Sequence, residues 1–502
     1  MLLKVLVDAS TAMRSTRSRL AKKAALAAVL RSVPPEEAAI AASYLSGVLR
    51  QRRTGLGWKS MSTLPLAAQE ASLTLTEVDE AFEQMAALSG TGSKTRRAAM
   101  LDGLLRRATA DEQTHIVALV TGELRQGALD ALVVDSLAEA VGAPIDAVRR
   151  AVMLAGSTAT VAEAVLTDGL DTLARFSLTV GTPVRPMLAS SASSVTEALA
   201  ALGGEAVLDA KLDGIRVQVH KRGEDVQVFT RTLEDITQRV PDIAAAVAAL
   251  PVDTAVLDGE ALLVGGDGRP RAFQDSSARI ASVGATAQLS VFFFDVLHLD
   301  GIDLIDRPAH ERFAHLASLL PLEMMVDRTT TTDAEVAEAF STRVLAAGHE
   351  GVVAKDPSAV YDAGRRGASW IKVKPVHTLD LVVLAVEWGS GRRSGKLSNI
   401  HLGARDGKGG FVMLGKTFKG MTDEMLDWQT TRFLALQTSR HAHVVHVRPE
   451  QVVEVAFDGV QRSTRYPGGV ALRFARVLRY RDDKSADDAN TLGEVLAFAP
   501  VQ

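Results

Sequence analysis

The sequence contains no cysteine, and this absence excludes several kinds of site. Without cysteine the chain forms no disulfide, no thiolate zinc cluster and no iron–sulfur centre, and it has no cysteine nucleophile. The absence also fits a reducing compartment, and we predict a cytoplasmic protein.

Long apolar runs are missing as well. No stretch approaches the roughly 18 apolar residues that a membrane span requires. The N-terminal segment carries Lys4 and Asp8 inside its apolar run, which is not the pattern of a signal peptide. The 502 residues, at roughly 150 per domain, predict about three soluble domains without a membrane partner.

A strong excess of one charge is the third absence. The chain carries 56 Lys and Arg against 60 Asp and Glu, a formal net charge of −4, which by itself does not predict a nucleic-acid partner. Locally the balance differs, because residues 1–60 hold eleven basic against three acidic residues and residues 372–420 hold nine against three. Each segment is either a solvated surface or a patch that faces a polyanion.

The hydrophobic pattern changes twice along the chain. Up to about residue 175 apolar residues recur at i, i+3 and i+4, which predicts helices. From about Gly181 strand-like alternation mixes with helical segments, and beyond Pro375 strand-like runs dominate. We predict a multidomain α+β protein with an all-α domain over residues 1–178, an α+β domain over 179–376 and a small β-barrel over 377–502.

The most informative segment is KLDGIR at residues 211–216, which lies between two strand-like runs. Alone, this pattern is as consistent with a charged β-turn as with a site. Further segments follow it in order: Arg231, DGE at 258–260, FFFD at 292–295, EGVVAK at 350–355, WIKVK at 370–374 and RFARVLRYRDDK at 473–484.

This ordered set resembles the nucleotidyltransferase motifs of ATP-dependent DNA ligases, which RNA ligases and mRNA capping enzymes share. GELRQGALDALVV at 122–134 resembles their DNA-binding domain, and WGSGRRSGKLSNIHLGA at 388–404 resembles the start of their OB-fold domain. The resemblance covers most of the chain and is strongest to archaeal and bacterial enzymes. It implies a helical DNA-binding domain, an adenylation (nucleotidyltransferase) domain and an OB-fold domain.

The resemblance implies that Lys211 is the catalytic nucleophile. A lysine amine can attack the α-phosphate of ATP, release pyrophosphate and keep AMP in a phosphoramidate bond. Free lysine has a pKa of about 10.4, so the site has to disfavour the ammonium form. Neighbouring cations do this, and they also neutralise the phosphates.

The resemblance also implies which residues surround the nucleotide. They are Asp209, where the family usually has Glu, Lys211, Arg216, Arg231, Glu260, Phe294, Arg366, Lys372 and Lys374. The arginines suit phosphate because a guanidinium binds two oxygens at once. Glu260 and Glu350 are the implied ligands of Mg²⁺, with Mn²⁺ as an alternative, since magnesium prefers oxygen donors.

Phe294 is implied to stack on adenine, although a Phe in such a strand is more often part of a core. Side chains alternate along a strand, so at least one of the three phenylalanines points away from its neighbours. For the same reason Lys372 and Lys374 share one face of a strand. There they either meet the α-phosphate or form an exposed strand edge.

The last motif departs from the family at Ala475, where Pro is usual. Arg473, Arg476 and Lys484 are present, and the family implies that these cations face the pyrophosphate while the barrel is closed. Ala in place of Pro changes local stiffness without removing a charge. The departure therefore concerns the timing of closure.

The leading hypothesis is an ATP-dependent DNA ligase that seals nicks in duplex DNA during replication, repair or recombination. It would encircle the duplex as a monomer and contact phosphates and groove shape. An RNA ligase or capping enzyme would lack the helical N-terminal domain, and a catalytically silent clamp would have no need of Lys211, Glu260, Glu350 and Lys372. An NAD-dependent ligase is disfavoured because that type resembles an arrangement with a cysteine-based zinc module.

Overall fold

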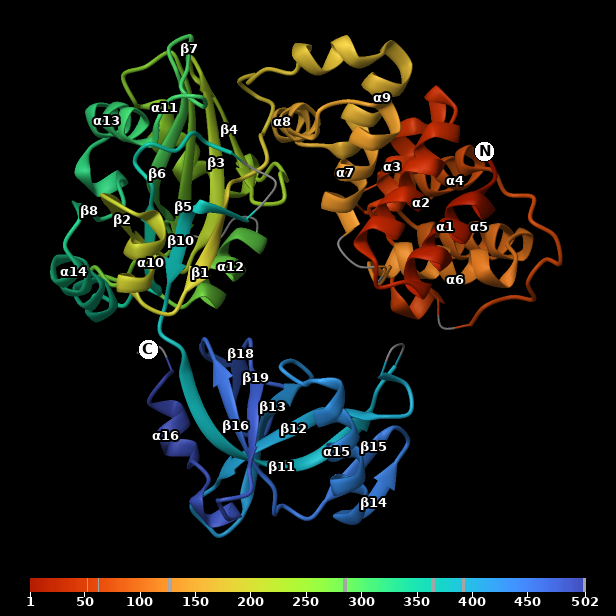
Figure 1. The fold of residues 1–502 in the computed structure, drawn as a ribbon, viewed down its shortest axis with the longest axis vertical. Helices are drawn as coiled ribbons and strands as arrows, with labels where there is room; N and C mark the ends of the chain where they lie inside the picture. Colours follow the sequence, from red (N-terminus) through yellow and green to blue (C-terminus); the bar gives the residue numbers. More distant parts are fainter. Residues whose placement is uncertain are drawn as a thin grey trace.

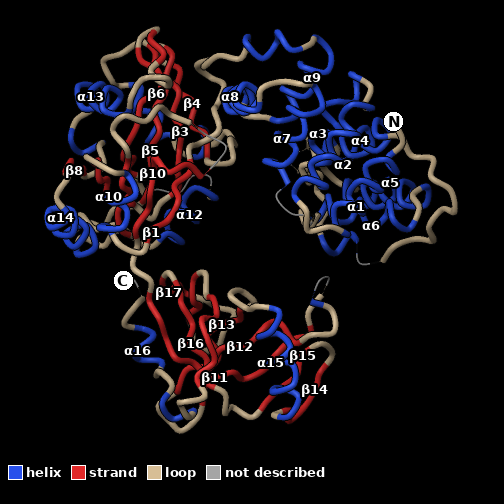
Figure 2. Tube along the Cα trace, viewed as in Figure 1, coloured by secondary structure: helices blue, strands red, loops and turns tan. Residues whose placement is uncertain are grey.

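The computed structural model describes residues 1–51, 53–61, 63–124, 126, 129–282, 287–362, 366–390 and 393–499. The chain forms three lobes arranged in an arc, and the N-terminus lies in the first of them (Figure 1). Figure 2 shows that the first lobe is helical and that strands gather in the other two. Within the described ranges, no helix has the length and apolar character to cross a membrane.

The helical lobe comprises the elements up to residue 175. They are α1 (Leu3–Ser15), α2 (Arg19–Ser32), η1 (Pro35–Glu37), α3 (Ala38–Leu45), η2 (Trp58–Met61), α4 (Leu75–Ala87), α5 (Ser93–Arg107), α6 (Ala110–Thr121), α7 (Leu129–Val141), α8 (Ile145–Ala155), α9 (Thr158–Asp168) and η3 (Leu170–Arg175). α4 and α6 each begin with a capping box, in which Thr74 pairs with Glu77 and Thr109 with Glu112. Their apolar faces meet in a single core around the fully buried Phe82.

The middle lobe contains two five-stranded sheets. Its strands are β1 (Leu188–Ala192), β2 (Ala206–Lys211), β3 (Ile215–Arg222), β4 (Asp225–Thr230), β5 (Thr254–Leu262), β6 (Ser290–Leu299), β7 (Ile302–Asp303), β8 (Arg328–Thr331), β9 (Gly351–Lys355) and β10 (Arg366–Val373). One sheet has the order β1-β10-β9-β2-β8 and the other β4-β3-β5-β6-β7. In the first sheet, β1 pairs with β10 and β2 with β9, so strands from distant parts of the chain lie side by side, whereas the second sheet pairs mostly consecutive strands.

Helices cover these two sheets. They are α10 (Val195–Leu202), α11 (Pro241–Ala248), α12 (Phe273–Ala281), α13 (Ala309–Leu319) and α14 (Ala334–Ala346), with short turns at η4 (Thr237–Arg239) and η5 (Leu322–Met324). α10 and α14 pack on the first sheet around Phe340, and α11 and α13 pack on the second around Phe293. The expected hairpin turn between β3 and β4 is present at Gly223, which has a φ of 57°.

The C-terminal lobe follows β10. It contains β11 (His377–Trp388), β12 (Leu397–Arg405), β13 (Phe411–Thr417), α15 (Asp423–Ala435), β14 (Gln437–His441), β15 (Val444–Val447), β16 (Val452–Phe457), β17 (Gly459–Arg462), β18 (Val470–Arg473), β19 (Arg476–Arg481), η7 (Ala486–Asp488) and α16 (Leu492–Leu496). The first half of the long strand β11 pairs with β16, and its second half pairs with β12 on one edge and with β15 on the other. The helix α15 lies within this lobe and was not expected from the sequence.

The predicted fold class is confirmed, because a helical N-terminal region, a mixed core and a C-terminal sheet lobe follow one another along the chain. The predicted domain boundaries at 178/179 and 376/377 stay predictions. Residues 176–187 connect the helical lobe to β1, and we call them the linker.

Candidate active site

Lys211 stands at the end of β2, opposite Gly351 of β9. Its Nζ forms an ion pair with the carboxylate of Glu350, the residue before β9. Glu350 also accepts a hydrogen bond from Lys374 Nζ at 3.0 Å. A side chain at Gly351 would meet the carbonyl oxygen of Val373 at 2.2 Å, so glycine is needed where β9 and β10 approach. The fold thus gathers two lysines on one carboxylate.

The pKa values of the two predicted metal ligands are shifted in opposite directions. Burial by itself raises the pKa of Glu350, but Lys211 and Lys374 hold it below its ordinary value. Burial raises the pKa of Glu260 to about 7, against the opposing effect of Lys211 and Arg216. Glu260 is therefore a buried carboxylate whose charge is incompletely compensated, which is the setting in which a bound cation stabilises the ionised form.

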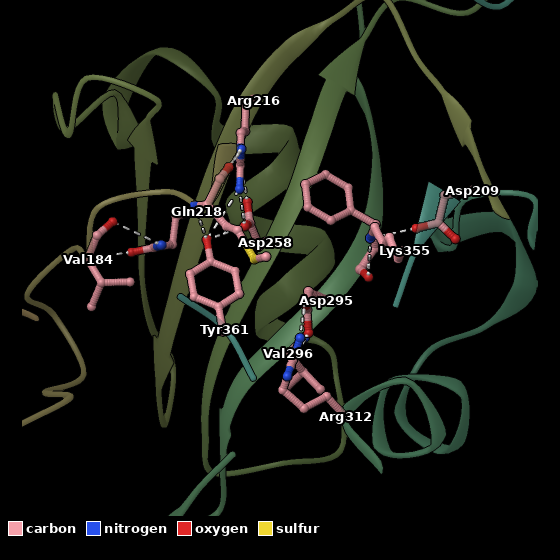
Figure 3. Close-up of polar contacts among 12 residues, drawn as sticks. Val184, Asp209, Arg216, Gln218, Asp258, Asp295, Val296, Arg312, Lys355 and Tyr361 are labelled. Atoms are coloured by element: carbon pink, nitrogen blue, oxygen red, sulfur yellow. Dashed lines mark hydrogen bonds and ion pairs between the residues drawn. The ribbon is translucent and has the colours of Figure 1, made fainter. Parts of the chain in front are cut away.

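Arg216 lies beside Glu260 in the register of β3 and β5 and is held by a buried network (Figure 3). Its Nε and Nη2 donate to the two oxygens of Asp258 at 3.0 and 2.6 Å. Its Nη1 donates to the carbonyl of Met187 at 2.6 Å, and Tyr361 Oη donates to Asp258 at 2.7 Å. These contacts leave the guanidinium fixed in orientation.

The FFFD strand β6 alternates as predicted. Phe293 is fully buried under the second sheet, whereas Phe294 packs between the core of the first sheet and the apolar cluster that contains Tyr361 and Trp370. The ring of Phe294 stands edge-on to Trp370, with ring centroids 5.9 Å apart. Arg216 Cζ lies 5.4 Å and Lys355 Nζ 4.7 Å from its centroid. Phe294 thus faces the charged residues of the site.

Asp209 is buried and forms ion pairs with two cations from neighbouring strands, of which Figure 3 shows Lys355. Arg328 donates to both of its oxygens at 2.6 and 2.8 Å, and Lys355 Nζ lies 2.6 Å from it. Burial opposes ionisation, yet Arg328 and Lys355 hold the pKa of Asp209 below its ordinary value. The carboxylate of Asp209 therefore holds the side chains of Arg328 and Lys355 in place. Its predicted contact with the nucleotide stays a prediction.

Three other predicted residues lie on or beside strands of the two sheets. Arg231 is exposed in the turn after β4 and makes no hydrogen bond or ion pair with the residues that the structure describes. Lys372 lies on β10, opposite Val353 and Ser191. Arg366 is the first residue of β10, and its side chain lies outside the described part of the structure.

The structure describes only part of the two further segments that resemble DNA ligases, residues 122–134 and 388–404. Arg125, Gly127 and Ala128 of segment 122–134 and Gly391 and Arg392 of segment 388–404 lie outside the described residues.

The C-terminal lobe brings one of its three predicted cations to the site. Arg473 forms a two-point ion pair with Asp213, with Nη2 3.1 Å from Oδ1. Lys484 instead contacts Asp380 of its own lobe at 2.6 Å. Ala475, at the position of the family's Pro, accepts a hydrogen bond on its carbonyl from Thr417 at 2.6 Å.

Arg476 begins β19 and pairs in register with β16. It therefore lies within the sheet of the C-terminal lobe.

Several residues of the site were not predicted from the sequence. They are Asp213, Asp258, Arg328, Lys355, Tyr361 and Asp458. Asp213, Asp258 and Lys355 lie inside the quoted motifs, so the sequence contained a signal for them. Tyr361 and Arg328 lie outside any motif, and only the packing of strands shows their contacts.

Comparisons with known proteins identify families, relatives and solved structures that are similar to this chain. The family descriptions "DNA ligase N terminus", "ATP dependent DNA ligase domain" and "ATP dependent DNA ligase C terminal region" match residues 59–138, 186–374 and 393–484. A protein named "Probable DNA ligase" from Nocardioides sp. (strain ATCC BAA-499 / JS614) is 60% identical over 499 residues, which is 98% of either chain.

A second "Probable DNA ligase", from Kineococcus radiotolerans, is 59% identical and covers 99% of this chain and 100% of its own length. The solved structure "Pmar-Lig_PreS3" has a TM-score of 0.63 at 18% identity, covers 95% of this chain and 99% of its own, and shares the fold. The chain belongs to the family of ATP-dependent DNA ligases.

Proposed function

We propose that this protein seals nicks in duplex DNA at the expense of ATP, with Lys211 as the nucleophile. The observation that carries the proposal is the convergence of Lys211, Lys374, Glu350 and Glu260 at the ends of strands from both sheets. A lysine beside carboxylates and a second cation is the arrangement that phosphoryl chemistry requires.

The reaction then has three balanced steps. Lys211 Nζ attacks the α-phosphorus of ATP, an N–P bond forms, pyrophosphate leaves and the amine loses its proton. A 5′-phosphate oxygen of the nick then attacks the same phosphorus, the N–P bond breaks, and the lysine regains a proton as DNA-adenylate forms. Finally the 3′-hydroxyl attacks the 5′-phosphate, loses its proton and releases AMP.

Glu350 has to exchange its partner during the first step, because its carboxylate contacts Lys211 in the structure. We propose that Glu350 and Glu260 hold Mg²⁺, which would supply positive charge to the phosphates. The donor set fits, since both groups are carboxylates and magnesium keeps water and phosphate oxygens as its other ligands. The described residues contain no group of three or more acids and histidines that could hold a metal ion.

We assign roles to the other predicted residues from the family resemblance and, where the side chain is described, from its surroundings. Phe294 presents its ring beside Arg216 and Lys355, and we assign it to the adenine. Arg216, Lys372 and Lys374 are assigned to the phosphates of the nucleotide, together with Arg366. Arg231, exposed next to this site, is assigned to the nucleotide and then to the 5′-phosphate of the nick.

The duplex is proposed to lie inside the arc of the three lobes, which would act as a monomer (Figure 1). The two locally basic segments, residues 1–60 and 372–420, lie in or lead into the two lobes at the ends of the arc. These lobes meet at an ion pair between Arg17 and Asp423, 4.0 Å apart and exposed on both sides. An exposed pair contributes at most about 1 kcal/mol, so breaking this contact between the two end lobes to admit DNA costs little.

We further propose that the protein works in the cytoplasm, where genomic DNA and ATP meet in a bacterial cell, and that its domains are divided at 178/179 and 376/377. The absence of cysteine from the chain is consistent with a reducing environment.

The direct test is the covalent adduct. Wild-type protein incubated with labelled ATP and Mg²⁺ should retain label on Lys211, while Lys211→Ala should remain folded and retain none. Lys4→Ala changes an exposed lysine paired with Asp8 and serves as the matched control. An unchanged adduct yield in Lys211→Ala would refute the assignment.

The nucleic-acid substrate is tested separately. Nick sealing should require ATP rather than GTP or NAD, and a nicked DNA duplex should be sealed faster than one with RNA at the nick. A protein that forms the adduct and seals only RNA would belong to the RNA-ligase alternative. A protein that binds DNA without forming the adduct would be a clamp.

A further inference from the structure

The helical lobe is docked into the middle lobe by the end of α8. Met153 and Leu154 of α8 are buried in one apolar cluster with Met187 of the linker and with Tyr361 and Trp370 of the middle lobe. Tyr361 belongs to the network around Arg216. The core of the docking contact is therefore continuous with the wall of the active site.

Arg185 of the linker clamps this contact. Its Nη1 and Nη2 both contact the carboxylate of Asp130, and Nη2 donates to Thr158 Oγ1 at 2.9 Å. Its Nε donates to the carbonyl of Gly156 at 3.2 Å, and its backbone N–H donates to the carbonyl of Met153 at 2.9 Å. A planar guanidinium bonded at both ends holds the linker in one position on the helical lobe.

Two residues beyond Arg185, the linker reaches Arg216. The carbonyl of Met187 accepts from Arg216 Nη1 at 2.6 Å, and its N–H donates to Tyr361 Oη at 3.0 Å. Val184 exchanges hydrogen bonds with Gln218 at 2.8 and 3.3 Å, as Figure 3 shows. The linker is thus bonded on one side to the helical lobe and on the other to the strand that carries Arg216.

The end of α8 also supports the turn that carries Arg231. Leu233 of this turn has a φ of 62°, a left-handed conformation that costs a non-glycine residue roughly 1–2 kcal/mol. A Cβ at Gly156, the C-cap of α8, would lie 2.9 Å from Leu233 Cδ1 and 2.8 Å from the carbonyl of Pro183. The strained turn is therefore packed directly against the helical lobe.

We propose that Arg185 is a positioning residue for lysine adenylation. By fixing the linker to the helical lobe it sets the position of Met187, and Met187 sets the orientation of Arg216 at the nucleotide phosphates. The inference deepens the proposed function and rests on it. It means that the helical lobe acts on the chemistry at Lys211 as well as on DNA.

The first experiment measures lysyl-AMP formation at saturating ATP without DNA. Arg185→Gln should lower its rate constant about tenfold, because small displacements of a phosphate-binding group are costly. Arg150→Gln is the matched control, since Arg150 also joins α8 to the middle lobe, through two 2.6 Å contacts with Asp306, but has no bond to the linker. Arg150→Gln should leave the rate unchanged.

A double-mutant cycle separates positioning from a general loss of structure. If Arg185 acts through Arg216, then Arg185→Gln should have little further effect in an Arg216→Lys background. Asp130→Asn, which removes the partner of Arg185 in the helical lobe, should slow adenylation in the same way. The Asp130→Asn variant tests the same contact if Arg185→Gln does not fold.

The outcomes are distinguishable. An unchanged rate in both Arg185→Gln and Asp130→Asn would overturn the inference, as would an equal loss in Arg150→Gln or additive effects in the cycle. Failure of the wild-type protein to form any adduct would overturn the proposed function instead.

Discussion

Arg473 of the C-terminal lobe and Asp213 of the KLDG turn form a two-point ion pair, although they are 260 residues apart in the chain. Asp213 lies two residues beyond Lys211, so this pair places the C-terminal lobe against the turn that follows the predicted nucleophile. A second ion pair, between Lys374 and Asp458, crosses the same boundary. These two ion pairs hold the C-terminal lobe closed on the site.

Removing the first of these ion pairs should open the C-terminal lobe. Asp213→Asn leaves Arg473 without its carboxylate, and a loss of about 1 kcal/mol would shift the ratio of closed to open forms roughly fivefold. Because the chain has no cysteine, single dyes can be placed at the exposed positions Leu322→Cys and Lys408→Cys for energy-transfer measurements. Arg479→Gln is the control.

Arg479 pairs with Glu454 inside the C-terminal lobe, so its loss should not change the distance between the dyes. An unchanged distance in Asp213→Asn would show that the ion pair does not hold the lobe closed.

Asp458 is expected to compete with phosphate for Lys374, a predicted nucleotide ligand. Its carboxylate and that of Glu350 both contact the ammonium, and they raise the pKa of Lys374 against the effect of burial. Asp458→Asn should free the lysine and lower the KM for ATP in adduct formation, about fivefold if one charge-assisted hydrogen bond no longer has to be broken. Glu450→Gln, at an exposed pair in the same lobe, should leave the KM unchanged. A KM that rises in Asp458→Asn would contradict this competition.

The buried pair of Arg312 and Asp295 should dominate the stability of the middle lobe. Both side chains are fully buried, and the two contacts measure 2.8 and 2.9 Å (Figure 3). Asp295→Ala leaves an uncompensated buried guanidinium and should lower the free energy of unfolding by about 3–5 kcal/mol. The double variant with Arg312→Leu should recover part of that loss, measured by urea unfolding. A double variant less stable than Asp295→Ala would count against this account.

The stability of the middle lobe should fall in mild acid because of His220. Burial, helped by the nearby His298, lowers the pKa of His220 to about 4 from an ordinary 6.5. Between these values the unfolded chain binds a proton that the folded chain does not, so the free energy of unfolding falls by up to about 1.4 kcal/mol for each pH unit of acidification. The loss begins below pH 6.5 and levels off near pH 4.

The measurement is the urea midpoint at pH 7 and pH 5. His220 Nδ1 accepts the N–H of Gly181 at 2.9 Å, and His220→Gln keeps an acceptor oxygen but does not titrate. The variant should depend less on pH than the wild-type protein, whereas His443→Gln, at an exposed histidine, should not differ from it. Equal pH dependence in His220→Gln and the wild-type protein would exclude His220 as the cause.

The proposed encirclement of the duplex by the three lobes can be tested by trapping DNA between them. Arg17 and Asp423 mark the contact between the two end lobes, so Arg17→Cys combined with Asp423→Cys can be joined by a short bismaleimide. The joined protein should resist removal by high salt from a nicked circle and slide off a linear duplex. Either single variant should be removed from both DNAs. Equal release from the circle by the joined protein would contradict encirclement.

Much of the fold followed from local pattern. The helical period up to about residue 175 and the alternation around KLDGIR correctly predicted helices and strands, because each depends on residues a few positions apart. The alternation also explains why Phe293 enters a core while Phe294 turns to the site. The helix α15 was not predicted, because its sequence lies between strand-like segments and the whole region was expected to form strands.

The sequence by itself determined the fold class and the family, and it predicts the nucleophile, since these depend on motifs whose residues are contiguous along the chain. Only the tertiary structure determined which charged side chains form ion pairs with each other. Arg216 is joined to Asp258, 42 residues away, and Lys374 to Asp458, 84 residues away. Such pairs depend on the order in which strands assemble into sheets and on where one lobe closes on another, and a buried cation needs its partner wherever the fold places it.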